Sequence, residues 1–256
     1  MKTLLKLVLV SALFFASGLL KAEPSDDSTK YFIGEPVIVD DTNSNSKGNE
    51  ITEKANKTLL NSVIALDNLM GDSDNAIPPI LISQSDGIVI FPAAFKLALG
   101  AAGGQGARGV AMVRRVDGTW SNPFFVSLGE GSLGFQIGAQ KSEIVLLFKD
   151  REDLLAIDKV EVTLGGDVGV AAGPAFHGSS ATTDFKFDSE IYSYSRSKGL
   201  FAGVSLKGGV LTFNNSVNES LYCMEDIDSD DILYDFPTPY NDKVFDLIEA
   251  LNMYGE

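Results

Sequence analysis

The sequence predicts an α+β fold: a mostly antiparallel, glycine-rich sheet of barrel or sandwich type, with a helix before it and an amphipathic helix packed on it at the C-terminal end. Three observations lead to this prediction. Short apolar runs follow one another from residue 87 to residue 213. Turn-forming pairs such as Asp117-Gly118 and Gly208-Gly209 separate these runs, a spacing typical of antiparallel sheets. Apolar stripes at helical spacing lie on either side of the sheet region.

The first helix is predicted over residues 50–70. Gly71 ends it, and Pro78-Pro79 prevents its continuation. Residues 80–82 are predicted as a short apolar turn before the first strand. The apolar side chains of the helix recur every three or four residues and therefore lie on one face. They are Ile51, Ala55, Leu59, Val63, Leu66 and Met70.

The sheet is predicted from a series of strands, with one helix over residues 151–157 among them. Trp120 follows the turn at Asp117-Gly118 and precedes Phe124-Phe125, so its ring is expected to be mostly buried beside the sheet. The strands are expected over residues 87–91, 110–113, 124–126, 144–148, 160–163, 185–187, 191–194, 200–206 and 210–213.

The C-terminal helix is predicted from four apolar residues at positions i, i+3, i+4 and i+7. We expect it to pack on the body of the domain, because most apolar stripes belong to a core; a free helix that binds a partner is the alternative. The acidic segment over residues 225–235 is expected to be a solvated linker, with loose calcium binding as the alternative. The four residues are Val244, Leu247, Ile248 and Leu251.

Residues 1–22 have the features of a secretory signal peptide. Lys2 and Lys6 are basic, and the fourteen-residue apolar run that follows is too short to span a membrane. Cleavage is expected near Ala22; cleavage after Gly18 and an uncleaved membrane anchor are the alternatives. The protein is therefore predicted to be exported, to the periplasm or another part of the envelope.

Two further regions follow the predicted signal peptide. Residues 23–49 are rich in Asp, Asn and Ser and are expected to form a mobile polar leader. Residues 50–254 are expected to form a single domain that includes the acidic linker and the last helix.

Charge and composition exclude several functions. The chain has 20 Lys and Arg against 35 Asp and Glu, a formal net charge of −15, which argues against a nucleic-acid partner. His177 and Cys223 are the only histidine and cysteine, so a zinc site of these ligands is excluded. The sequence predicts no catalytic residue, no metal site and no cofactor. An enzyme with catalytic carboxylates remains an alternative, although the sequence does not locate such a site.

Two glycine-rich stretches match the G-x-G-x-x-G pattern, at residues 104–109 and 129–134. A nucleotide loop needs a strand, a tight turn and then a helix, so that helical N–H groups face a phosphate. Both stretches here run into apolar β segments instead. We therefore interpret these glycines as structural, allowing strands to coil tightly or to cross.

Several motifs resemble the SYLF domain family, also called the Ysc84-type actin-binding family, over residues 50–254. Three positions depart from the family pattern, at Phe176-His177, Lys207 and 221–223. The motifs are Gly118-Thr119-Trp120-Ser121-Asn122-Pro123, Gly134-Phe135-Gln136-Ile137-Gly138-Ala139-Gln140, Ala171-Ala172-Gly173-Pro174, and the run from Tyr192-Ser193-Tyr194 to Gly203-Val204-Ser205-Leu206.

The resemblance implies a binding module and no enzyme activity. Eukaryotic relatives bind phosphoinositide membranes, fungal ones bind and bundle actin, and bacterial ones are exported. The resulting hypothesis is a non-enzymatic envelope protein that binds anionic or phosphoinositide-like lipid, the partner being a membrane surface. A structural domain, or one that binds a protein partner, is the alternative.

The candidate lipid contacts are bases close to apolar residues. Arg196 and Lys198 would share one face of a strand near Phe201, unless they pair with acids such as Asp184, Asp188 or Glu190. The candidates are Lys54, Lys57, Arg108, Arg114, Arg115, Arg196 and Lys198.

Overall fold

A computed structural model describes residues 42–72, 76–174, 187–199, 206, 208–235 and 241–255. From residue 41 onward the chain forms one compact unit. The predicted signal peptide, His177 and most of the strands predicted over 185–187 and 200–206 lie outside the described residues.

Within the described residues the sheet has six strands and is antiparallel except for one pair, which confirms the predicted α+β class. Their order is β3-β6-β2-β5-β4, with β1 on the other edge of β2. β4 pairs with β5 in parallel. The strands are β1 (Gly87–Val113), β2 (Phe124–Phe148), β3 (Val162–Thr163), β4 (Val170–Ala172), β5 (Ile191–Gly199) and β6 (Val210–Phe213).

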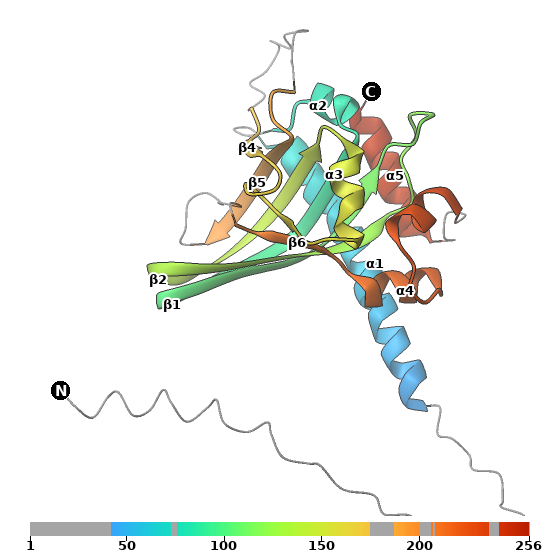
Figure 1. Cartoon of the computed structure of the whole chain (residues 1–256), viewed down its shortest axis with the longest axis horizontal. Helices are drawn as coiled ribbons and strands as arrows, with labels where there is room; N and C mark the ends of the chain where they lie inside the picture. Colours follow the sequence, from blue (N-terminus) through green and yellow to red (C-terminus); the bar gives the residue numbers. More distant parts are fainter. Residues whose placement is uncertain are drawn as a thin grey trace, which may run out of the picture. The chain divides into compact units, whose positions relative to one another are not determined.

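The glycine-rich stretches lie inside strands, so the prediction of four separate strands over 87–148 is wrong. β1 has 27 residues and β2 has 25, and they pair along nearly their whole length. The two G-x-G-x-x-G motifs face each other in this ladder, Gly104 opposite Gly131 and Gly106 opposite Gly129. Neither motif leads into a helix, which confirms that these glycines are structural. Figure 1 shows β1 and β2 running together away from the helices, towards the left of the view.

The sheet carries apolar cores on both faces. Phe125, Val145 and Leu147 of β2 lie on one face, called here the helix face, where they share a core with residues of three helices. Leu128 and Ile144 lie on the opposite face with the remaining core residues. The three helices of the helix face are α1 (Thr42–Met70), α2 (Pro79–Gln84) and α5 (Asp242–Gly255).

Helix α1 begins at Thr42, eight residues before its predicted start and within the stretch predicted as leader. Its predicted stripe is confirmed, since Ala55, Leu59 and Leu66 are buried. Residues 80–82 belong to α2 rather than to a turn, because Pro79 is well placed in the first turn of a helix.

Helix α5 packs beside α1, as predicted for the C-terminal helix (Figure 1). Val244, Leu247 and Leu251 are buried between them and the sheet. Hydrogen bonds join the two helices at both ends: Asn241 donates to Asn56 at 2.7 Å, and Tyr254 donates to Asp67 at 2.9 Å.

The opposite face is covered by short elements. The predicted helix over 151–157 is confirmed as α3 (Arg151–Leu155), continued by the 3-10 turn η1 (Ala156–Asp158). Helix α4 (Asn215–Tyr222) was not predicted from the sequence, and it contributes to both faces, with Val217 packed on the helix-face core and Tyr222 in the opposite core. The prediction that the acidic segment is a solvated linker is wrong, because Ile227, Ile232 and Leu233 are buried in the core of this face. The segment ends in the π-helical turn η2 (Asp231–Asp235), and Asp230 pairs with Lys159 at 3.1 Å.

The long ladder turns back on itself. A Cβ atom on Gly109 would overlap the carbonyl oxygen of Ile90 and lie 2.5 Å from a ring carbon of Phe91. The two ends of β1 are therefore in direct contact. The N–H of Arg114 also donates to the carbonyl of Asp86 at 2.8 Å, just beyond these ends.

Trp120 is buried, as predicted, with 2% of its surface exposed. The Arg114 guanidinium lies over its ring, 4.3 Å from the centroid. This contact fixes the loop between β1 and β2 against the end of the ladder.

Gly109→Ala is expected to lower the free energy of unfolding by about 1–3 kcal/mol, because the methyl group has no room against Ile90 and Phe91. Gly129→Ala is the matched control, since nothing lies within 4 Å of a Cβ there. Urea unfolding of both variants tests this. Equal midpoints for the two variants would show that β1 does not turn back in this way.

Candidate functional site

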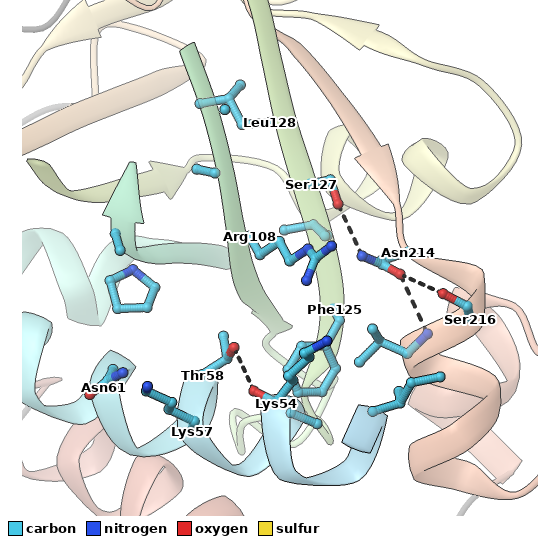
Figure 2. Close-up of a pocket in the computed structure, with 18 of the residues that line it drawn as sticks. Lys54, Lys57, Thr58, Asn61, Arg108, Phe125, Ser127, Leu128, Asn214 and Ser216 are labelled. Carbon is cyan, nitrogen blue, oxygen red and sulfur yellow. Dashed lines mark hydrogen bonds between the residues drawn. The ribbon is translucent and has the colours of Figure 1, made fainter. Parts of the chain in front are cut away.

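A groove of about 710 Å³ lies on the helix face, between α1, the β1–β2 ladder and the start of α4 (Figure 2). Its floor is largely apolar and includes Ile51, Ala55 and Phe125. Its polar side chains come from four separate parts of the sequence, which form three walls. Among the described residues that line it, three are bases and none is an acid: Lys54, Lys57 and Arg108.

The α1 wall presents Lys54, Lys57, Thr58 and Asn61, which are spaced three and four residues apart and so share one side of the helix. Lys54 forms an exposed ion pair with Glu50 at 2.6 Å, one turn earlier. The hydrogen bond and charge of Lys54 hold the pKa of the Glu50 carboxyl below its ordinary value. Lys57 has no such partner among the described residues.

The sheet wall presents Arg108 from β1. It stands directly opposite Ser127 of β2 in the ladder, so the two side chains share the helix face. Figure 2 shows Arg108 extending into the space above α1. Arg108 is exposed and forms no ion pair with any described acid.

The third wall is the start of α4, held in place by two asparagines. Asn214 caps the helix by accepting from the N–H of Val217 at 3.4 Å and donates to Ser127 at 3.0 Å. Asn218 is fully buried; it accepts from the N–H of Phe125 at 2.7 Å and donates to its carbonyl at 3.0 Å. These bonds attach α4 to β2 and close this end of the groove.

The arrangement suits the binding of an anion beside apolar surface. Lys57 and Arg108 offer charged donors that no described acid neutralises, in a chain with 35 acids against 20 bases. The described lining contains no carboxylate, histidine or cysteine that could act as a base or nucleophile. The described residues also contain no cluster of three potential metal-ligating side chains.

Comparison with known proteins identifies the family. Residues 129–254 match the sequence model of the Ysc84 family, described as "Las17-binding protein actin regulator". The chain is 32% identical over 185 residues to SH3 domain-containing YSC84-like protein 1 of Rattus norvegicus, which covers 72% of this chain and 53% of the relative. The chain belongs to the SYLF, or Ysc84-type, domain family.

Fungal relatives are similar to the same extent. Identity is 31% over 177 residues to Protein YSC84 of Saccharomyces cerevisiae, covering 67% of this chain and 36% of the relative. It is 34% over 176 residues to the SH3 domain-containing protein PJ696.02 of Schizosaccharomyces pombe, covering 66% and 39%. The chain thus spans about half the length, or less, of these relatives. No solved structure matches it.

Two of the candidate arginines have structural contacts within the SYLF domain. Arg114 donates to the carbonyls of Ile82, Ser85 and Gly118 at 2.9–3.0 Å. Burial lowers the pKa of its guanidinium, and nearby Asp86 opposes this effect. These donors connect α2 to the loop after β1.

Arg115 has a similar role. It donates to the carbonyl of Trp120 at 2.6 Å and to that of Leu233 at 3.3 Å. It therefore ties the acidic segment, more than a hundred residues later, to the same loop.

Arg196 lies apart from the groove. It stands opposite Glu143 in the β2–β5 ladder and forms long ion pairs, at 3.7 Å with Glu143 and 3.8 Å with Asp72. The acids suggested from the sequence are not its partners among the described residues; Glu190 instead accepts from the N–H of Gly169. Lys198 follows in β5, but its side chain, like Phe201 and Asp184, lies outside the described residues.

Among the lining residues, sequence reasoning proposed only Lys54, Lys57 and Arg108; those it missed include Phe95, Ser127 and Asn214. Asn214 precedes the short helix α4, and an Asn in this place is a typical N-cap, which was the available signal for the helix. Phe95-Lys96-Leu97 alternates apolar and basic residues as a half-buried strand does, which was the available signal for a strand there. No described helix has both the length and the apolar character needed to cross a membrane.

Arg115→Gln is expected to lower the free energy of unfolding by about 2–3 kcal/mol, because buried carbonyls lose charged donors. Arg108→Gln is expected to change it by less than about 0.5 kcal/mol, since the side chain is exposed and unpaired. Thermal and urea unfolding of both variants distinguish the structural arginine from the free one. A larger loss for Arg108→Gln would contradict this assignment.

Proposed function

We propose that this SYLF domain is a non-enzymatic module that binds anionic phospholipid or phosphoinositide-like membrane surfaces through the groove. The observation that carries the proposal is the convergence of Lys54, Lys57 and Arg108 on one groove without a lining acid. These bases are separated by up to 54 positions in the sequence, so only the fold brings them together.

The energetic argument is local. Each base close to an anionic membrane surface contributes about 1 kcal/mol. The net charge of −15 opposes approach to an anionic surface, so only a local group of bases can offset it. The groove must therefore face the membrane for binding to be favourable, and binding must weaken as salt screens the charges over about 10 Å at 0.1 M.

The family is consistent with a lipid or protein partner. Its description names Las17 binding and actin regulation, and several relatives carry SH3 domains in their names. These partners are named for the family and for its relatives, not for this chain. The lining of the groove favours lipid here, because its unpaired bases complement phosphate groups and its floor is apolar.

Lys57→Gln combined with Arg108→Gln is expected to weaken binding to vesicles of phosphatidylglycerol and phosphatidylcholine by roughly tenfold to 30-fold, from two bases at about 1 kcal/mol each. Lys149→Gln combined with Lys243→Gln is the matched control, because it removes the same charge away from the groove. All variants keep the same N-terminal segment, so differences between them report on the domain. Vesicle co-sedimentation at two salt concentrations measures the effect.

Equal loss in both double variants would show that overall charge, and not the groove, controls binding. Absence of wild-type binding to anionic and neutral vesicles alike would reject the lipid function and favour a protein partner.

We also propose that the protein is exported. The support is the basic start and the apolar run within residues 1–22. The N-terminus of the protein recovered from the cell envelope is expected near Glu23, as determined by N-terminal sequencing. Recovery of a chain that still begins at Met1 would contradict cleavage.

A further inference from the structure

Two large apolar side chains stand next to each other on the outside of the β1–β2 ladder. Phe95 is 55% exposed and Leu97 is 60% exposed. They are two positions apart in a stretch of regular pairing, so they point to the same side of β1. The intervening Lys96 and the flanking Ala94 and Ala98 are less exposed, because they face the other side.

This pair is continuous with the groove. Phe95 itself lines the groove together with Arg108 and Lys57. Lys141 stands opposite Phe95 in the ladder, exposed, with its ammonium 5.9 Å from the ring centroid. An apolar pair is thus bordered by Lys141 on one side and by the groove bases on the other.

The charge of this region is the reverse of the charge of the whole chain. Residues 92–109 and 126–142, which form this part of the ladder, contain three bases and one acid. The acid is Glu130. It lies two residues after Leu128 in the strand and therefore shares the opposite face with it, where burial raises the pKa of the Glu130 carboxyl. On the face that carries Phe95 and Leu97, the charged residues of these two segments are therefore both bases, Arg108 and Lys141. Glu143 follows on the same face, where Asn68 donates to it and Arg196 pairs with it.

We infer that Phe95 and Leu97 insert into the boundary between headgroups and acyl chains of an anionic bilayer, and so hold the groove against the headgroups. This inference rests on the proposed function and adds a second, apolar contribution to it. Side chains of this kind bind interfaces when bases beside them meet anionic headgroups. Lys141 has the length to keep its ammonium among the phosphates while Phe95 enters the apolar layer.

The same features disfavour a second copy of this chain as the occupant. A two-fold interface would place Lys141 and Arg108 of one copy near the same residues of the other, and like charges repel. An anionic bilayer complements both the apolar pair and its basic border.

The test compares wild-type protein, Phe95→Ser combined with Leu97→Ser, and Val116→Ser combined with Val160→Ser. The last is the matched control, because Val116 and Val160 are also exposed apolar residues but lie outside the ladder. Vesicles of phosphatidylglycerol and phosphatidylcholine are used beside vesicles of phosphatidylcholine alone. We expect the Phe95 and Leu97 variant to bind anionic vesicles at least roughly tenfold more weakly, and the control to bind like wild type.

A second measurement reports insertion directly. Leu97→Trp fluorescence is expected to be quenched by vesicles with brominated acyl chains, and Val116→Trp fluorescence is not. Trp120 is buried and contributes equally to both variants. This readout stands even if the serine variant loses stability.

The outcomes separate the two proposals. If the Phe95→Ser and Leu97→Ser double variant binds anionic vesicles as wild type does, and Leu97→Trp is not quenched, the insertion is overturned and the groove function stays intact. Quenching at position 97, together with unchanged binding by the Lys57 and Arg108 variant, would support insertion and reject the groove. Absence of wild-type binding to either vesicle would overturn both.

Discussion

The continuous pairing of β1 with β2, together with the close contact where β1 meets itself, determines the rest of the structure. Gly109 lies against Ile90 and Phe91 so tightly that no side chain fits there. Because the ladder turns back, its two ends bring apolar residues from distant parts of the sequence into the same two cores. The loop between β1 and β2 is then held in place by two arginines. Arg114 bonds it to α2, and Arg115 bonds it to the acidic segment.

The same curvature explains where the groove lies. Helices α1, α2 and α5 share a core with the apolar ends of the ladder, whereas its glycine-rich middle extends beyond them. Arg108 and Phe95 line the groove together with residues 51–61, in the middle of α1. A binding site and an exposed apolar pair thus arise at the same boundary between covered and uncovered sheet.

Bases in this acidic chain have two distinct uses. Arg114 and Arg115 are partly buried, and each planar guanidinium donates to more than one backbone carbonyl. Lys57 and Arg108 are exposed, and no described acid pairs with them. The distinction matters for function, because only the second kind can exchange water for an external anion.

Local sequence determined much of the fold. Helical periodicity located α5 and most of α1, the residues around Trp120 indicated its burial, and the context of the glycine motifs excluded a nucleotide loop. The same reasoning proposed Lys54, Lys57 and Arg108, but equally Arg114, Arg115, Arg196 and Lys198. It could not rank them, because the partners of Arg115 and Arg196 come from Leu233 and Asp72, far away in the sequence. Only the tertiary structure decided which bases are occupied and which gather in the groove. It also decided that the glycine-rich segments continue as strands. Glycine has no side chain, so these segments show no alternation of apolar and polar residues from which a strand could be predicted.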